Sequence, residues 1–253
     1  GPAVSLFTLG TMRALQDRAK MVAVLRAAHA AGINHLETAP AYGPAETFLG
    51  QALDQLAQEG IVPEGGWLIT SKLLPGLSLE QGKRALSACL ERLGRPFLHG
   101  LAVHGLNREE HLHWAVEGEG ARLLDWALKS GLVGQVGFSS HGSNALIARA
   151  IATGRFRFCS LHLHLLDPAR LPLALEALDA GMGVMAISPA DKGGRLQAPS
   201  SRLKADCQPW DPLALAYRYL LAAGISTLTV GASRPSDLNL AASMASSDGA
   251  LTP

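Results

Sequence analysis

The stretch Gly32-Ile-Asn-His-Leu-Glu-Thr-Ala-Pro-Ala-Tyr-Gly43 marks a change from helix to strand that recurs along this chain. Apolar residues with helical spacing precede it, and Gly32 lies where a helix commonly ends in a left-handed glycine. Residues 33–38 then predict a short strand, which Pro40 ends because proline cannot donate to a strand ladder. Glu37 is therefore expected at a strand's carboxyl end and Tyr42 in the loop after it. The alternative is that Glu37 is a surface charge and Tyr42 a loop anchor.

Short strand-like runs alternate with helical runs over the whole 253 residues, as in a parallel sheet wrapped by helices. The predicted strands are Ser5–Leu9, Ile33–Glu37, Trp67–Ser71, Leu98–Val103, Gly134–Phe138, Phe158–Leu163, Gly183–Ile187 and Thr227–Val230. The predicted helices are Asp17–Ala31, Ala45–Glu59, Ser78–Leu93, Gly120–Ser130, Ser143–Thr153, Pro168–Ala180, Pro212–Ala223 and Pro235–Met244. Eight such units predict a TIM (β/α)8 barrel, one domain over residues 1–253. The alternative, a doubly wound open sheet, lacks a G-x-G-x-x-G after its first strand.

Composition limits the functions that the chain can have. Its formal net charge is +1 with no basic run, which excludes a nucleic-acid partner or an anionic membrane surface. Three widely spaced cysteines, Cys89, Cys159 and Cys207, favour a reducing compartment without a disulfide framework. No apolar run reaches the roughly 18 residues of a membrane span, and the start has no signal-peptide pattern. We therefore expect a soluble, cytoplasmic protein that acts on small molecules.

Reactive groups of such a barrel collect where its strands end. Lys72 and His104 each follow an apolar strand, as Glu37 does. A tyrosine has a pKa near 10, too high for an efficient acid, but an adjacent ammonium lowers it. Glu37 would hold Lys72 in place, Tyr42 would donate the proton, and His104 would bind the substrate oxygen. Taken singly, Lys72 is also consistent with a solvated strand end and His104 with a core histidine. Reduction of a carbonyl would further require a nicotinamide cofactor, because no side chain supplies hydride.

These residues carry a resemblance to the aldo-keto reductases. The segment from Gly32 to Gly43 is similar to that family's G-x-N-x-F-D-T-A-x-x-Y-G pattern. Further matches are Gly10-Thr11-Met12, Ser71-Lys72, Leu93-Gly94 through His104, Gly137-Phe138-Ser139, Ser188-Pro189 and Val230-Gly231-Ala-Ser-Arg234. The resemblance implies a TIM barrel, NADPH or NADH, and a small carbonyl substrate. It also implies that Tyr42 is the acid, that Lys72 and the carboxylate tune it, and that His104 orients the carbonyl.

The expected cofactor residues follow from the same resemblance and from the loop glycines. They are Gly10, Thr11, Met12, Ser139, Ser140, Ser160, Ile187, Ser188, Pro189, Gly193, Gly194, Leu196, Gly231, Ser233, Arg234 and Asp237. Four positions depart from the family: Glu37 replaces its aspartate, Ser140 an asparagine, Ser160 a glutamine, and Ile187 the tyrosine that stacks on the nicotinamide. These changes predict weaker or altered nicotinamide binding.

The stretch between Pro189 and Pro212 is predicted to be a long irregular loop, and such loops are usually functional. Gly193 and Gly194 would let the backbone approach a pyrophosphate, which Lys192 and Arg195 would neutralise. Residues 191–196 also resemble a branch whose members often continue into a ferredoxin-like iron–sulfur tail, which this sequence does not contain.

The cofactor is expected to be NADPH, with NADH as the alternative. Arg234 opens the last helix and favours a 2′-phosphate. The carboxylate of Asp237 would repel this 2′-phosphate unless it simply caps the helix.

Two other functions stay open. His162 and His164 are two apart on a predicted strand and therefore point to one side, so with His104 they could ligate zinc in a barrel hydrolase. The favoured carbonyl reductase needs no metal. The third function is a catalytically degenerate barrel that serves as a redox partner or binding module.

Overall fold

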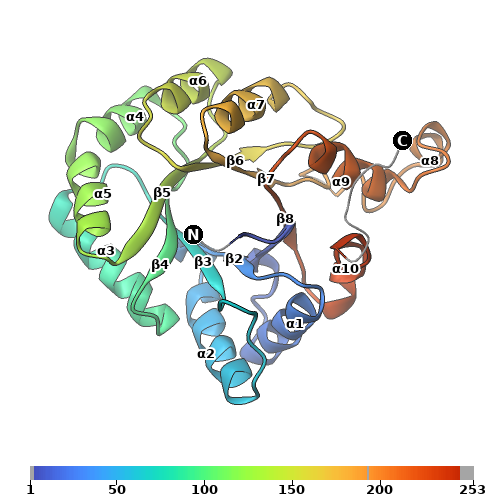
Figure 1. Cartoon of the computed structure of the whole chain (residues 1–253), viewed down its shortest axis with the longest axis horizontal. Helices are drawn as coiled ribbons and strands as arrows, with labels where there is room; N and C mark the ends of the chain where they lie inside the picture. Colours follow the sequence, from blue (N-terminus) through green and yellow to red (C-terminus); the bar gives the residue numbers. More distant parts are fainter. Residues whose placement is uncertain (1–2, 193, 246–253) are drawn as a thin grey trace.

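A closed parallel barrel of eight strands dominates the computed structural model, which describes residues 3–192 and 194–245. Figure 1 looks down the barrel, with the strands around the centre and the helices outside them. The strands are β1 Phe7–Gly10, β2 His35–Glu37, β3 Leu68–Leu73, β4 Leu98–Val103, β5 Val133–Ser140, β6 Phe158–His162, β7 Gly183–Ile187 and β8 Thr227–Gly231. Strand β1 pairs in parallel with both β2 and β8, which closes the sheet. The predicted TIM barrel is confirmed.

Helices follow the strands around the outside of the barrel. They are α1 Arg18–Ala30, α2 Ala45–Gln58, α3 Leu79–Leu93, α4 Glu109–Val116, α5 Glu119–Lys129, α6 Asn144–Ala152, α7 Leu171–Asp179, α8 Ser201–Asp206, α9 Pro212–Ala222 and α10 Asn239–Ala245. Three short 3-10 helices are η1 Thr11–Arg13, η2 Pro40–Tyr42 and η3 Pro235–Leu238. None of the helices in the described ranges is both long and apolar enough to cross a membrane.

Two helices differ from the expected pattern. Helix α4 was not predicted, and α8 lies inside the stretch expected to be irregular. The side chain of Ser200 caps α8 by accepting a hydrogen bond of 3.2 Å from the backbone N–H of Leu203. Figure 1 places α8 at the edge of the molecule, away from the barrel. Helix α8 buries none of its own residues, so it leaves no apolar stripe from which a sequence could predict it.

The turn before β2 has the conformation that the sequence predicts. Gly32 has a φ of 72°, and its N–H donates to the carbonyl of His29 at 3.0 Å. The N–H of Ile33 donates to the carbonyl of Ala28 at 2.9 Å, so this turn uses two of the four orphan carbonyls of α1. Pro40 then begins η2, which ends at Tyr42. This turn therefore sets where Glu37 and Tyr42 emerge.

A neutral polar layer lies inside the barrel, one step below the strand ends. The ring of His35 is within 2.8 Å of the hydroxyls of both Thr8 and Thr70. Burial, with a smaller effect of His99, lowers the pKa of His35 to about 4, so this ring is uncharged at neutral pH. Successive side chains of a strand alternate between its two faces. A side chain two residues after His35 or Thr70 therefore points into the barrel as well, one layer nearer its carboxyl end.

Candidate active site

Two strand-derived groups meet at the carboxyl end of the barrel. Glu37 lies two residues after His35 on β2, and Lys72 lies two residues after Thr70 on β3. The register pairs Glu37 with Thr70, which places the two side chains on adjacent strands. They form a buried ion pair, with Glu37 4% exposed and Lys72 3% exposed. The extra methylene of Glu37 therefore does not prevent the carboxylate from reaching the lysine.

Tyr42 completes this set from η2. The Lys72 ammonium donates a hydrogen bond of 2.8 Å to the phenol oxygen, and the phenol donates one of 3.2 Å to Glu37 Oε1. Lys72 also donates to the backbone carbonyl of Thr38 at 3.3 Å. The ammonium lies 4.6 Å from the centre of the Tyr42 ring. These contacts fix the phenol against the ion pair.

Burial governs the protonation of this set more than its internal charges do. Burial lowers the pKa of Lys72 to about 7 and raises the pKa of Tyr42 above its usual value. The pKa of Tyr42 thus shifts in the direction opposite to the expected acidification by the ammonium, because burial disfavours the phenolate. The phenol remains protonated at neutral pH and so keeps a proton to donate.

His104 follows β4 and faces the same phenol. Its ring lies edge-on to the Tyr42 ring, with centroids 5.9 Å apart. Its backbone N–H donates to the carbonyl of Leu73 at 2.7 Å, which anchors the residue to the end of β3. Burial, followed by the charges of Lys72 and His141, lowers the pKa of His104 to about 4. His104 is thus a neutral imidazole, able to donate a hydrogen bond without carrying charge.

One cavity of about 680 Å³ joins this cluster to the expected cofactor residues. The expected catalytic and cofactor residues that line this cavity are Gly10, Met12, Glu37, Tyr42, Lys72, His104, Ser139, Ser160, Ile187, Ser188, Pro189, Gly231 and Asp237. Ile187 thus presents an apolar wall where the family has an aromatic ring. Within residues 3–192 and 194–245, the Ser160 hydroxyl has the sulfur of Met185 as its one partner, at 3.6 Å. Sulfur is a weak acceptor, so this hydroxyl has further capacity to bind a ligand.

The other expected cofactor residues that the structure describes, Thr11, Ser140, Gly194, Leu196, Ser233 and Arg234, are not part of this lining. Thr11 is buried and donates to the Thr38 hydroxyl at 3.0 Å, while the Ser140 hydroxyl donates to the Leu106 carbonyl at 2.6 Å. Leu196 is buried at 1% exposure, and Gly194 has a φ of 71°. Gly193 lies outside the described residues. Ser140 therefore braces a loop, in contrast to the ligand contact implied by the resemblance.

Asp237 caps the end of the loop that Ser233 and Arg234 form. Its Oδ2 accepts from the backbone N–H of Ser233 at 2.9 Å and from that of Arg234 at 3.3 Å. Its Oδ1 accepts from the Arg234 guanidinium at 3.0 Å. Partial burial raises the pKa of this carboxyl, but the hydrogen bonds from Ser233 and Arg234 prevail and lower it. Arg234 is therefore paired with a carboxylate, which the sequence pattern alone did not reveal.

Several residues that line the cavity were not predicted. They include Arg13, Asn107, His141, Gln197, Tyr217 and Thr229, whereas Lys192, which also lines the cavity, was expected to contact a pyrophosphate. Arg13 and His141 each lie within three residues of a strand's carboxyl end, which is the signal that would have found them. Tyr217 comes from α9 and reaches the cavity only through helix packing, so strand ends give no sign of it.

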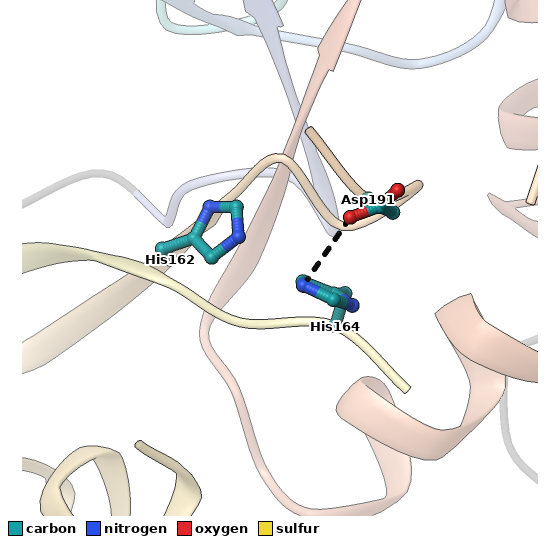
Figure 2. Close-up of side chains that lie close together, drawn as sticks. All are labelled: His162, His164 and Asp191. Atoms are coloured by element: carbon teal, nitrogen blue, oxygen red, sulfur yellow. Dashed lines mark ion pairs between the residues drawn. The ribbon is translucent and has the colours of Figure 1, made fainter. Parts of the chain in front are cut away.

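The histidines of the hydrolase alternative do not form the predicted trio. Across the described ranges, His162 and His164 group with Asp191 from the loop after β7, as Figure 2 shows, and His104 is absent from this group. His104 lies instead against Tyr42. The set of His104, His162 and His164 is therefore not a metal site in this fold.

Comparisons with known proteins agree with this arrangement. Residues 6–247 match the model of the aldo/keto reductase family. A 6-dehydroglucose reductase of Novosphingobium aromaticivorans is 31% identical over 242 residues, covering 85% of this chain and 75% of that protein. An aldo-keto reductase of Bacillus halodurans, solved in a holo form, superposes with a TM-score of 0.82 at 19% identity, covering 98% of this chain and 89% of its own. An aldo-keto reductase of Bombyx mori solved with NADP has a TM-score of 0.74 at 20% identity, and the match covers 98% of this chain and 85% of that one. The family match and the similar relative lead to one conclusion: the chain belongs to the aldo/keto reductase family of oxidoreductases.

Proposed function

We propose that this protein reduces a small aldehyde or ketone to an alcohol, with NADPH as reductant and Tyr42 as proton donor. The observation that carries the proposal is the hydrogen bond of 2.8 Å from the Lys72 ammonium to the Tyr42 phenol, at the wall of the cavity. A protonated phenol beside a buried ammonium has both the proton to give and the charge that stabilises the phenolate left behind.

The cavity has the size and the polar groups to accept a nicotinamide dinucleotide. Its volume falls in the range of about 300–1,000 Å³ typical of small-molecule sites. Thr229 Oγ1 is buried and has no hydrogen-bond partner in the part of the chain that the structure describes, so a ligand would satisfy it. Arg13 and Lys192 also line the cavity and supply positive charge for phosphates. When bound, a reduced nicotinamide supplies the hydride that no side chain can.

The chain's own groups then handle the proton. The phenol of Tyr42 turns its O–H from Glu37 to the carbonyl oxygen of the substrate and transfers the proton as that oxygen gains charge. Lys72 keeps its hydrogen bond to the phenol oxygen and stabilises the phenolate. Glu37 holds Lys72 in position. General acid catalysis of this kind contributes about 10²- to 10⁴-fold to a rate.

His104 has a separate task. Because its imidazole is neutral, its N–H can donate to the carbonyl oxygen and orient it toward Tyr42 without competing for the proton. The edge-on packing of its ring on Tyr42 keeps both donors on one side of the cavity.

Cofactor choice is part of the proposal. Arg234 provides the positive charge that favours the 2′-phosphate of NADPH, but its pairing with Asp237 reduces that advantage. We therefore propose a small preference for NADPH over NADH. The changes at Ser160 and Ile187 are expected to make binding of either cofactor weaker than in relatives that keep the glutamine and tyrosine.

The buried free thiols of Cys89, Cys159 and Cys207 fit a reducing compartment, so a cytoplasmic location also belongs to the proposal. The substrate class rests on the site and the family. The related protein's name, 6-dehydroglucose reductase, makes a sugar aldehyde one reasonable member of a test panel.

Titration with NADPH and NADH, followed by turnover of an aldehyde panel, tests the proposal. We expect saturable binding of both cofactors, with NADPH the tighter, and loss of NADPH absorbance when an aldehyde is added. Absence of binding at millimolar cofactor would overturn it and would favour a degenerate barrel that serves as a redox partner or binding module.

A further inference from the structure

A compact group of two imidazoles and one carboxylate lies beside the cavity and is not used in carbonyl reduction. It comprises His162 at the end of β6, His164 two residues later, and Asp191 in the loop after β7; we call it the His–Asp cluster. One ligand atom from each residue lies within 4.8 Å of the other two. Figure 2 shows the carboxylate of Asp191 beside the two imidazole rings.

Strand geometry and backbone hydrogen bonds hold the two histidines of the His–Asp cluster in place. Alternation along the extended chain puts His162 and His164 on one side, with ring centroids 4.8 Å apart and planes at 83°. Between them, the N–H of Leu163 donates to the Ile187 carbonyl on β7 at 3.3 Å. The His164 carbonyl accepts from the N–H of Asp167 at 3.1 Å. The two histidines are thus held by barrel strands and a turn, and rigid supports of this kind favour a defined site.

The nitrogens of these histidines are incompletely bonded. His164 is only 4% exposed and Asp191 8%. The Nδ1 atoms of both His162 and His164 are buried and have no hydrogen-bond partner among the described residues. A buried polar atom without a partner is costly, and each such atom in a folded protein calls for an explanation. A ligand bound at Nδ1 of His162 would provide one for that ring, whereas the His164 nitrogen that faces Asp191 is Nε2.

The distance across the cluster matches shared coordination better than a hydrogen bond. His164 Nε2 lies 3.6 Å from Asp191 Oδ1, beyond normal hydrogen-bond length. Two ligands that each bind a tetrahedral zinc ion at about 2.0–2.1 Å are about 3.4 Å apart. The third ligand atom, from His162, lies within 4.8 Å. A closure of roughly 1.4 Å, which side-chain rotation can supply, would give all three the spacing of zinc ligands.

We propose that the His–Asp cluster binds one Zn²⁺ ion through His162, His164 and Asp191, with water in the fourth position. Two imidazoles and a carboxylate suit zinc, whereas Mg²⁺ prefers oxygen ligands and keeps its water. The proposal does not depend on carbonyl reduction, because none of the three ligands belongs to the Tyr42, Lys72, Glu37 and His104 set.

Arg195 is the cation already beside this carboxylate. Its Nε donates to Asp191 Oδ2 at 2.7 Å and its Nη2 to Oδ1 at 3.3 Å. The side chain of Arg195 is 71% exposed, so it can move toward solvent while Oδ1 binds zinc.

Zinc at this place would join two neighbouring parts of the barrel end. Asp191 lies in a loop in which both it and Ser188 have positive φ values, 68° and 54°. For residues other than glycine this conformation is uncommon and is held by its surroundings. The same loop forms one wall of the cavity. A zinc ion shared with β6 would brace this wall.

Isothermal titration of the metal-free full chain with ZnCl₂ tests the proposal. We expect one equivalent of zinc to bind in the micromolar range or tighter, and MgCl₂ to give no heat of binding. His162→Ala, His164→Gln and Asp191→Asn should each weaken zinc binding at least tenfold. His113→Ala is the matched control, because the His113 side chain is 69% exposed and lies in α4, so its zinc affinity should stay at the parent value.

X-ray absorption at the zinc edge keeps the test independent of whether each variant folds. The zinc-loaded parent protein should show nitrogen and oxygen ligands at about 2.0–2.1 Å and no sulfur. Three results would each overturn the proposal: no binding at 100 micromolar zinc, parent-like affinity in all three folded cluster variants, or sulfur ligation by a cysteine.

Discussion

Replacement of Lys72 by methionine should destabilise the protein strongly, because Lys72 is the counter-charge of a buried carboxylate. The two side chains of the pair are only 4% and 6% exposed, so solvent cannot replace the lost ammonium. Removing one partner of a buried ion pair typically costs about 3–5 kcal/mol. We expect Lys72→Met to fall in that range. The change also removes the hydrogen bonds to the phenol and to the Thr38 carbonyl.

A double-variant cycle separates the charge effect from the loss of packing. In Glu37→Gln/Lys72→Met both charges are gone, and replacement of a buried pair by neutral groups of similar volume is often neutral or stabilising. The double variant should therefore be within about 1 kcal/mol of the parent or more stable, which gives a coupling energy of about 3 kcal/mol. Urea unfolding followed by circular dichroism at pH 6, below the pKa of about 7 of Lys72, measures each free energy of unfolding.

Lys83→Met provides the matched control. Its ammonium pairs with Glu80 on the surface of α3 at 2.8 Å, and its side chain is 30% exposed. An exposed pair of this kind contributes about 0.2–1 kcal/mol, so this variant should stay close to the parent. If Lys72→Met costs no more than Lys83→Met, or if the double variant is as unstable as Lys72→Met alone, Glu37 and Lys72 are not a buried charged pair.

Three further predictions concern activity and cofactor choice. Glu37→Gln should lower kcat for aldehyde reduction strongly, whereas Glu37→Asp should retain it, because only aspartate keeps a counter-charge for Lys72. Equal kcat values in Glu37→Gln and the parent protein would show that the carboxylate has a structural role only. Burial lowers the pKa of Lys72 to about 7, so kcat/KM should fall as pH rises through 7 and the ammonium is lost. The Lys72→Arg variant stays charged at every pH of the assay, so its kcat/KM should not fall in this range. The same fall in Lys72→Arg would show that another group titrates. Asp237→Asn frees Arg234 from its carboxylate and should raise the NADPH/NADH affinity ratio, whereas Arg234→Ala should lower it; a ratio unmoved by both would remove Arg234 from cofactor discrimination.

The fold could be predicted from the sequence because the signals that decide it are local. Gly32 ends a helix through its own backbone conformation, and Pro40 ends a strand because it has no N–H. Each β/α unit repeats such signals, so the number of units along the sequence is enough to predict the barrel. Helix α8 was missed because it is short and buries none of its residues, so that only its Ser200 cap marks it.

The candidate site was predictable where it lies at the ends of strands, and less so elsewhere. Glu37 and Lys72 meet because they lie on adjacent strands, each two residues after the contacting pair His35 and Thr70, and their residue types suggest the pairing. The sign of the Tyr42 pKa shift was not predictable, since it depends on how far the phenol is buried. The contact between Asp191 and His164 joins residues 27 positions apart and depends on a loop conformation with positive φ that no local pattern indicates.

Single-turnover reduction by Tyr42→Phe decides whether the phenol is the proton donor. NADPH is bound first and its affinity measured by fluorescence, then aldehyde is added and the loss of NADPH absorbance is followed. Tyr219→Phe, which alters a half-buried tyrosine of α9, serves as the control. We predict that Tyr42→Phe binds NADPH within about twofold of the parent and reduces aldehyde about 10²- to 10⁴-fold more slowly, the contribution of a general acid. Reduction by Tyr42→Phe at the rate of Tyr219→Phe would contradict the account.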